Sequence, residues 1–220
     1  MRMALASLAM LATGIAHAGG VGTITGGVDV TRPKGVEAGP ILVYVVGFTE
    51  PATEPAVEIQ QKGKRFIPDL VGITAGQSVT FPNGDPFLHN VFSPTDTRRF
   101  DLGSYEQGEN RNRKFPDPGV IDVYCNIHPE MSATIVVLPN RRHVIAKSDG
   151  SFTIEGVPTG TWNVFAYSRR AAHPVTVKVE VVAGTTATVE LLLDEVQREF
   201  KHDNKFGEKY REGDEYHPSH

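Results

Sequence analysis

The hydrophobic positions of this chain form short runs separated by turn residues, and most runs alternate apolar with polar side chains. A period of two is typical of β-strands that bury one face. In the first two thirds of the chain these runs are residues 21–30, 41–48, 56–60, 69–73, 78–81, 89–92, 120–125 and 132–138. Two strand pieces are expected around Phe100 and Arg113, inside a polar stretch. No long helical period precedes the C-terminal tail, so the chain is predicted to be all-β.

The alternation becomes cleaner after Asn140. The strands expected there are residues 144–147, 151–154, 161–167, 175–182 and 187–192. Asp149 and Gly150 form a typical hairpin turn pair between the first two of these strands. From Asp194 onward the chain is densely charged, and we expect a short helix followed by extended or disordered chain.

The first eighteen residues have the composition of a secretory signal peptide. Arg2 precedes an uncharged apolar run over residues 3–15, and Ala16-His17-Ala18 has the small residues of a cleavage site. Residues 1–18 are therefore predicted to be a signal peptide, and the periplasm is the simplest destination. The alternative is an apolar N-terminal anchor, although the run is short for a span of about 20 residues. The formal net charge of −4 argues against a broad nucleic-acid interface.

The chain contains a single cysteine, Cys125, so it has no internal disulfide. In an exported protein an unpaired cysteine indicates a reactive thiol, an intermolecular bridge or a metal ligand, and a small buried hydrophobic residue is the plainer alternative. Cys125 lies in the sequence YCNIHPEM, which also contains His128 and Met131. This short stretch therefore offers a thiolate, an imidazole and a thioether to one metal ion.

That combination of ligands favours copper over zinc. Structural zinc sites use four cysteine or histidine ligands, whereas blue-copper sites use one cysteine, two histidines and a weak axial methionine. The hypothesis requires a second histidine on an upstream strand, and His89 follows the proline-rich turn in PFLHNVF. Pro129 stiffens the loop after His128, and Asn90 is placed to hydrogen-bond across to the cysteine loop and tune the sulfur.

The motifs CNIHPEM and FPNGDPFLHNVF resemble those of the cupredoxin family. The first has the Cys-x-x-His-x-x-Met spacing of amicyanin-like and pseudoazurin-like ligand loops, and the second resembles the upstream ligand strand of the plastocyanin and amicyanin group. The resemblance implies a Greek-key β-sandwich with a type 1 copper site at one end. It implies that His89, Cys125 and His128 are strong ligands, that Met131 is the axial ligand, and that electrons pass through the edge of His128. Glu130 departs from amicyanin, which has an apolar residue there, and leaves the docking surface open.

The flanking sequence resembles a second family. The stretch SDGSFTIEGVPTGTWNVFAY is similar to the carboxypeptidase regulatory-like, transthyretin-like β-sandwich, and residues 22–28 resemble its first strand. The resemblance implies that the cupredoxin is inserted into a second, smaller sandwich, as in proteins labelled methylamine-utilisation proteins. The expected divisions are residues 1–18 (signal peptide), 19–52 and 140–194 (outer sandwich), 53–139 (cupredoxin) and 195–220 (charged tail).

The expected function is one-electron transfer through copper in the periplasm, with a cytochrome or a dehydrogenase as redox partner and no stable insertion into a membrane. No enzyme signature is present, and four protein ligands leave no open position for a substrate. Two alternatives remain: a copper carrier or storage protein, and a module whose outer sandwich binds a protein or a glycan. The basic clusters are either steering charges or ordinary solvated residues, and they are Lys62, Lys64 and Arg65, then Arg98 and Arg99, then Arg111, Arg113 and Lys114. His202, His217 and His220 of the tail are either loose copper-capturing residues or simply exposed.

Overall fold

The computed structural model describes residues 19–95 and 98–210. This part of the chain contains β-strands and no α-helix, so the all-β prediction is confirmed. Within it there is no helix that could span a membrane. The strands are β1 (Val21–Thr31), β2 (Leu42–Val46), β3 (Val57–Glu58), β4 (Gln60–Gln61), β5 (Phe66–Ile67), β6 (Leu70–Thr74), β7 (Ser78–Pro82), β8 (His89–Ser93), β9 (Phe100–Tyr105), β10 (Asn110–Lys114), β11 (Gly119–Tyr124), β12 (Ser132–Leu138), β13 (His143–Ile145), β14 (Ser151–Pro158), β15 (Gly160–Tyr167), β16 (Val175–Val181) and β17 (Thr186–Asp194).

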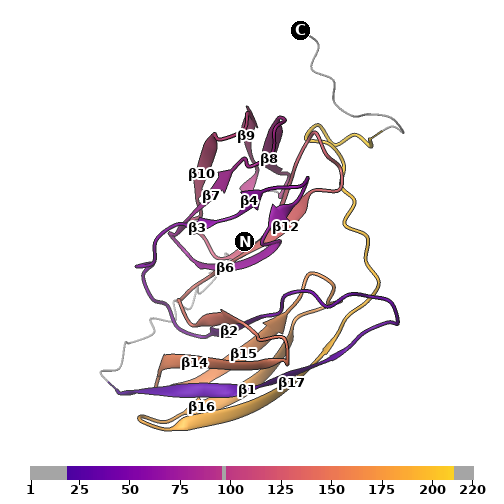
Figure 1. Cartoon of the computed structure of the whole chain (residues 1–220). Coiled ribbons are helices and arrows are strands. Elements are labelled where there is room, and N and C mark those ends of the chain that lie inside the picture. The colour runs from indigo at the N-terminus through magenta and orange to yellow at the C-terminus, as the bar shows by residue number, and fades with distance from the viewer. Residues whose placement is uncertain (1–18, 96–97, 211–220) are drawn as a thin grey trace, which may run out of the picture.

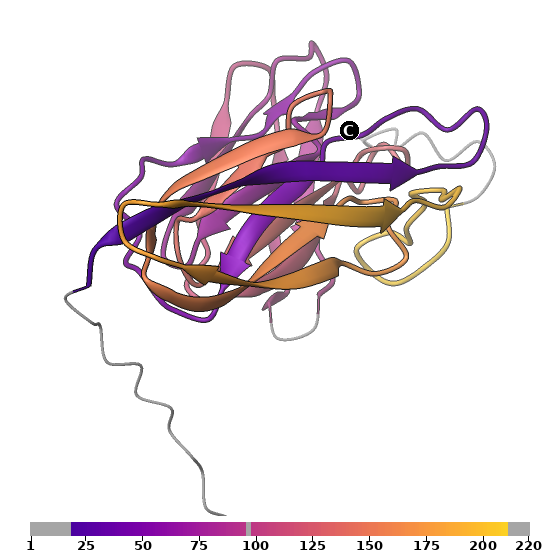
Figure 2. The same ribbon diagram turned by 90° about the horizontal axis from the view of Figure 1, so that it is seen from below.

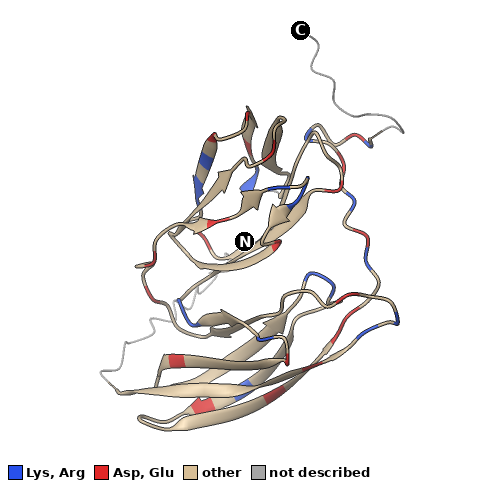
Figure 3. Ribbon diagram, viewed as in Figure 1, with Lys and Arg blue, Asp and Glu red and all other residues tan. Residues whose placement is uncertain are grey.

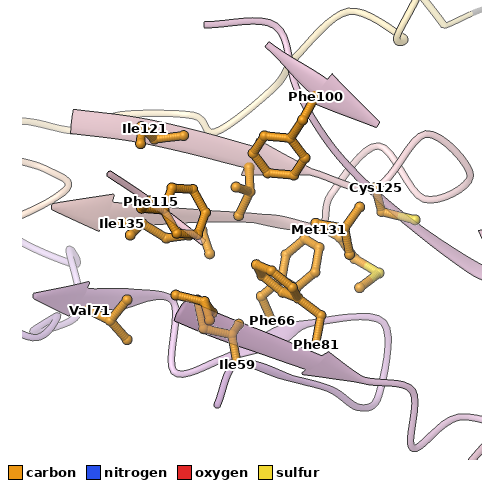
Figure 4. Packing of buried hydrophobic residues seen from close by; sticks show 14 of the residues in the cluster. Ile59, Phe66, Val71, Phe81, Phe100, Phe115, Ile121, Cys125, Met131 and Ile135 are labelled. Carbon is orange, nitrogen blue, oxygen red and sulfur yellow. The ribbon is translucent and has the colours of Figure 1, made fainter. Parts of the chain in front are cut away.

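The central strands form two main sheets that share one hydrophobic core. One sheet has the order β10-β7-β3 and the other the order β6-β12-β11-β8-β9, and both lie in the upper half of Figure 1. Alternate residues of each strand point inward, as in Val79 and Phe81 of β7 and in Ile121 and Val123 of β11. The inward residues pack together as one cluster, part of which is drawn in Figure 4. This unit is referred to below as the copper unit.

The strand β12 explains why one apolar run in the sequence does not alternate. All seven of its residues are buried. Ala133, Ile135 and Val137 face the core of the copper unit, whereas Val136 and Leu138 face a second, small apolar cluster. A strand that is covered on both faces needs no polar side, and its sequence therefore reads as a nearly continuous apolar run.

The first and last strands of the chain form two further sheets around a separate core. Their orders are β14-β1-β17 and β13-β2-β15-β16, and Figure 2 shows the long strands β1 and β17 from below. β1 is the central strand of the first sheet, and it pairs antiparallel with β14 and parallel with β17. These sheets are referred to below as the outer unit. Its kinship with carboxypeptidase regulatory-like sandwiches stays a prediction, as do the domain boundaries.

The two units meet at an interface that is partly apolar and partly charged. Leu42 of the outer unit packs with Leu70 and Leu138 of the copper unit in the small apolar cluster. Beside it, the buried guanidinium of Arg169 donates to the carbonyl and to the hydroxyl of Ser132 at 3.1 and 2.7 Å. These buried hydrogen bonds to Ser132, the first residue of β12, connect the outer unit to the strand that follows the candidate metal loop.

Arg169 also holds the copper unit through a second strand. Its Nη1 lies 2.8 Å from an Asp69 carboxylate oxygen just before β6, and its Nε donates to the Thr134 hydroxyl at 3.2 Å. A guanidinium presents several donors in a fixed plane, so one side chain satisfies acceptors on two neighbouring strands.

The chain crosses between the two units twice, and the two crossings lie side by side. The Glu50 amide donates to the Pro139 carbonyl at 3.0 Å. The Glu50 carboxylate in turn accepts from Arg142 at 2.8 Å, and the Nδ2 of the buried Asn140 side chain donates to the Val45 carbonyl at 3.0 Å. These contacts hold the entry and exit of the copper unit together.

The prediction of a short helix in the charged tail is wrong for the described residues. From Val196 to Tyr210 the chain is extended apart from one turn around residues 205–207. The tail lacks an apolar stripe that would favour a helix, and its polar groups bind distant parts of the chain instead. The predicted signal peptide at residues 1–18 lies outside the described residues. Acidic and basic positions are interspersed over both units, as Figure 3 shows, which fits the small net charge of −4.

Candidate metal centre

His89 is held by the turn that precedes it. It is the first residue of β8, and its backbone pairs with Tyr105 of β9. In the turn, the Asn83 side chain accepts from the Asp85 amide at 2.9 Å and donates to the Phe87 carbonyl at 2.9 Å. The sequence PNGDP therefore forms a fixed loop, because its asparagine replaces the backbone partners that a strand would supply.

Cys125 and Met131 lie at the two ends of a short loop between β11 and β12. Tyr124 and Ser132, the flanking strand residues, are paired across the hairpin. Inside the loop the Cys125 amide donates to the Met131 carbonyl at 3.2 Å, and the Met131 amide donates to the His128 carbonyl at 3.0 Å. The spacing of three residues between each pair of candidate ligands therefore becomes a tight, internally bonded turn.

Three of the four predicted ligands come together in the structure. The Cys125 Sγ lies 3.8 Å from the His89 Nδ1 and 3.8 Å from the His128 Nδ1. One ligand atom from each residue lies within 4.8 Å of the others, and all three residues are buried. With metal–thiolate and metal–imidazole bonds of about 2.3 and 2.0 Å set about 120° apart, sulfur and nitrogen are separated by about 3.7 Å. The three residues therefore fit around one metal ion.

Met131 lies at the same end of the core. Its side chain is fully buried, and Figure 4 shows its sulfur and that of Cys125 beyond the aromatic rings of Phe66 and Phe81. A buried thioether in this position suits a weak axial ligand. That Met131 binds the metal stays a prediction, as does the complete ligand set.

The protonation of His89 is set by Asp85, a residue that sequence reasoning missed. The His89 Nε2 lies 2.9 Å from the Asp85 carboxylate, so Nε2 carries the proton and Nδ1 presents its lone pair toward the Cys125 sulfur. Burial lowers the pKa of His89, although Asp85 opposes this effect, and the imidazole is therefore neutral. The signal available in the sequence was an acidic residue four positions before a candidate ligand.

Asp85 is itself fixed by backbone donors from another part of the chain. Burial alone raises its pKa, but hydrogen bonds from the Lys64 amide, His89 and the Gly63 amide hold the pKa below its ordinary value. Asp85 therefore stays ionised, as a hydrogen-bond acceptor for the His89 ring must.

The surroundings of the Cys125 thiol have opposing effects on its pKa. Burial raises its pKa, and backbone N–H groups of Asn90, Ile127 and His128 oppose that rise by donating toward the sulfur. The Ile127 amide donates to the Cys125 sulfur at 3.4 Å. A metal cation would displace the thiol proton and take its place within this ring of donors. The predicted link from Asn90 across to the cysteine loop is present, because its Oδ1 accepts from the Asn126 amide at 3.3 Å.

An aromatic edge leads from the candidate ligands to the surface. The Phe87 ring lies 5.2 Å from the His89 ring and 5.3 Å from the His128 ring, centroid to centroid. Phe87 is 38% exposed, and His128 is 8% exposed. The Lys64 ammonium lies over the Phe87 ring, 5.7 Å from its centroid, and Glu130 is exposed on the loop that contains His128. The rim of the site thus combines an apolar ring with charges of both signs.

The remaining sequence candidates lie away from the ligand group. His202 stacks on the Tyr124 ring at 4.3 Å and does not belong to the group of ligand atoms. His217 and His220 lie outside the described residues. Arg111 lies over the ring of Tyr105, so part of one basic cluster packs on the protein's own surface.

Comparison with known proteins identifies the family. The chain matches no family model. It is 34% identical over 83 residues to the plastocyanins of Ulva arasakii and Ulva pertusa, and each match covers 33% of this chain and 85% of the plastocyanin. Among solved structures, an amicyanin variant in the Cu(I) state has a TM-score of 0.36 at 17% identity, covering 43% of this chain and 97% of the amicyanin.

Two other solved structures match at a similar level. A purple cupredoxin from Nitrosopumilus maritimus has a TM-score of 0.34 at 22% identity, and the match covers 37% of this chain and 98% of that protein. A copper-containing nitrite reductase from Thermus scotoductus has a TM-score of 0.36 at 26% identity, and the match covers 49% of this chain and 28% of the reductase. On the plastocyanin matches, the chain belongs to the plastocyanin family, and copper is its cofactor.

Proposed function

We propose that this member of the plastocyanin family is a periplasmic one-electron carrier whose copper is held by His89, Cys125, His128 and Met131. The observation that carries the proposal is the position of the Cys125 sulfur, 3.8 Å from the Nδ1 atom of each histidine. When bound, copper supplies a one-electron couple between Cu(II) and Cu(I). The protein's part is to hold the ligands so that they need not move when the charge changes.

The surroundings of the ligands support this role. His89 is fixed on a strand and by the Asp85 carboxylate. Cys125 is fixed by the hydrogen bond from its backbone amide to the Met131 carbonyl and by its burial in the core of the copper unit. Ligands that are locked by hydrogen bonds and packing rearrange little, and a small rearrangement favours fast electron transfer.

The exit for the electron is the edge of His128 that faces Phe87. His128 is the ligand with the largest exposed fraction, 8%, whereas His89 and Cys125 are fully buried. A redox protein such as a cytochrome or a dehydrogenase would dock over this rim. Its charge must suit both Lys64, whose ammonium lies over the Phe87 ring, and Glu130, which is exposed on the loop that contains His128.

The periplasmic location rests on the signal-peptide pattern of residues 1–18. Mass determination of the protein recovered from the periplasm would test it. A mature chain beginning at Gly19 is expected, and a mass that includes residues 1–18 would contradict the assignment.

The function is tested by a visible absorption spectrum during titration with Cu(II). An intense blue band is expected from the native protein, because thiolate-to-copper charge transfer requires Cys125 in the first coordination sphere. The Cys125→Ser variant should lack the band while keeping the β-sheet circular dichroism of the copper-free protein. A pale native product would contradict the type 1 assignment.

A copper carrier or storage protein is the alternative with the same ligands. The two functions differ in reversibility. A carrier of electrons should cycle many times between oxidised and reduced forms without losing copper to a Cu(I) chelator, whereas a copper carrier should release the metal after reduction. Repeated reduction and reoxidation in the presence of the chelator separates them. The third possibility, that the outer unit binds a protein or a glycan, has no specific observation in its favour.

A further inference from the structure

The C-terminal tail joins the outer unit to the loop that contains Cys125. After β17 the chain leaves the outer unit and runs along one side of the molecule, drawn in yellow in Figure 1, to the end of the copper unit. Residues 196–210 are called the C-terminal strap below. Near its start, the strap is fixed by Arg198, which donates to the Arg169 carbonyl at 3.2 Å, and by Phe200, whose ring lies 4.1 Å from the Arg169 guanidinium.

The far end of the strap binds the backbone and side chain of the metal loop. The Lys205 amide donates to the Asn126 Oδ1 at 2.7 Å. The Tyr210 hydroxyl donates to the Cys125 carbonyl at 3.3 Å. The Lys205 ammonium lies 2.8 Å from an Asp101 carboxylate oxygen on β9. Two successive residues of the loop, one of them a predicted copper ligand, are therefore held from outside by the strap.

Asn126 is gripped from both sides. Its amide donates to the Asn90 Oδ1 on β8 at 3.3 Å, and its own Oδ1 accepts from the strap. Asn90 is oriented by Asp101, which accepts from the Asn90 Nδ2 at 2.7 Å and also binds Lys205. These hydrogen bonds form a closed circuit of four residues: Asn90 on β8, Asp101 on β9, Asn126 in the metal loop and Lys205 in the strap. Such a circuit restricts the loop in addition to the hydrogen bonds of its own internal turn.

Aromatic packing and a stiff turn hold the strap in place. The His202 ring stacks on Tyr124 at 4.3 Å and meets the Tyr210 ring edge-on at 5.5 Å. In the turn that follows, the Asn204 Oδ1 accepts from the amides of Phe206 and Glu208, each at 2.9 Å. A side-chain cap of this kind replaces secondary structure, so Lys205 and Tyr210 are presented by an ordered segment.

We propose that the C-terminal strap is a positioning element for the copper loop, acting through Lys205 and Tyr210 on Asn126 and Cys125. The inference rests on the proposed function, since it assigns the strap a part in tuning the same site. With the Cys125 backbone fixed, the Ile127 amide stays directed at the sulfur, to which it donates at 3.4 Å. Hydrogen bonds to the thiolate and the exclusion of water both favour the less charged Cu(I) state.

The same contacts would also arise if the strap merely covered an apolar surface, and the two roles predict different consequences. A cover stabilises the fold and leaves the loop unchanged. A positioning element changes the local opening of the loop and the electronic properties of the site. The test therefore needs a readout at the loop itself and a second at the metal.

The first readout is hydrogen exchange of the Asn126 and Ile127 amides in the copper-free protein, followed by NMR. A chain ending at Val196 should exchange both amides about tenfold faster or more, because two contacts to the loop are lost. Tyr210→Phe keeps the ring and loses only the hydroxyl, and an increase of about fivefold is expected. Glu199→Gln is the matched control, since this carboxylate is on the strap but 74% exposed, and no change is expected.

The second readout is the reduction potential and the blue band of the copper-loaded variants. The shortened chain should show a lower potential and a broader band than the native protein, with Tyr210→Phe between them. Unchanged exchange of the Ile24 amide would show that the outer core remains folded. Native exchange rates at Asn126 and Ile127 in the shortened chain would overturn the proposal. Because exchange is measured without copper, a native protein that lacks a blue band would refute the proposed function without deciding the role of the strap.

Discussion

Replacement of Asp85 by asparagine tests whether the carboxylate orients His89. Asp85→Asn keeps the shape of the side chain but removes its charge and one of its two acceptor oxygens. Three N–H groups donate to the native carboxylate: the Gly63 amide to one oxygen at 2.7 Å, and the Lys64 amide and His89 ring to the other at 3.0 and 2.9 Å. The NH₂ group of asparagine cannot accept a hydrogen bond, so at least one donor loses its partner.

The magnitude follows from that count. A hydrogen bond to a charged group contributes about 1.5–3 kcal/mol net. If the asparagine oxygen stays with Lys64 and His89, only the bond from Gly63 is lost, and the copper-free protein should lose about 1.5–3 kcal/mol of its free energy of unfolding. If the side chain turns the other way, the bond from Gly63 is kept, and both Lys64 and His89 lose their acceptor. Copper affinity should fall by about 10–100-fold, because the ligand ring is then free to rotate.

Two measurements check this prediction. Urea unfolding of the copper-free protein, followed by far-UV circular dichroism, gives the change in the free energy of unfolding. Competition with a chelator of known affinity gives the change in copper binding. The matched control is Asp117→Asn, which makes the same chemical change at an exposed site. Equal behaviour of the two variants in both measurements would refute the role of Asp85.

The same variant gives a pH test with a definite sign. The pKa of Asp85 is held below its ordinary value in the folded protein. Its contribution to stability is therefore present above the ordinary carboxyl pKa of about 4 and is lost as the pH falls through the lowered folded value. The difference in stability between the native protein and Asp85→Asn should be constant near neutral pH and should shrink below about pH 4. A difference that widens on acidification would contradict the reasoning.

Three further predictions concern the outer unit and its interface. Arg169→Lys keeps the charge but loses the fork that binds Ser132, and it should lower the free energy of unfolding by about 1.5–3 kcal/mol; an unchanged urea midpoint would exclude a structural role for the fork. Burial lowers the pKa of His143 in the folded protein. As the pH falls below about 6.5, this histidine therefore becomes protonated in the unfolded chain before it does so in the folded protein, and the free energy of unfolding should decline. Thermal melts of His143→Gln should show a shallower decline over that range. Gly150 has φ of 83° and an added Cβ would lie 2.5 Å from the Val28 carbonyl oxygen, so Gly150→Ala should cost about 1–3 kcal/mol in the same unfolding experiment, and a neutral result would mean that the turn rearranges freely.

The strands and the ligand loop could be predicted because their signals are local. The run that became β12 was predicted with the bounds that the structure gives, Ser132–Leu138. The loop ligands are three residues apart, and a turn joining two paired strands brings such neighbours together whatever the rest of the chain does. The short strand β5 (Phe66–Ile67) was missed, because two residues are too few to show a period of two.

The supports of the site could not be predicted because their partners are distant in the sequence. Asp85 is held by Gly63 and Lys64, more than twenty residues earlier. Nothing in the composition of the tail indicates that Lys205 lies against Asn126. Its dense charge favours a short helix followed by solvated, extended or disordered chain, whereas the structure shows extended chain bound to groups that only the tertiary fold brings near.

The division between local ligands and distant supports has a physical consequence for the site. A loop of seven residues from Cys125 to Met131 places its donor atoms by its own turn, and the internal bonds of that turn are few. The rigidity that electron transfer requires must therefore come from groups outside the loop. Asp85 supplies it to His89, and Asn90 supplies it to Asn126 on one side of the sulfur. Changes to these supports leave every ligand in place, so they should alter the potential and the copper affinity by degrees, whereas removal of a ligand abolishes the site.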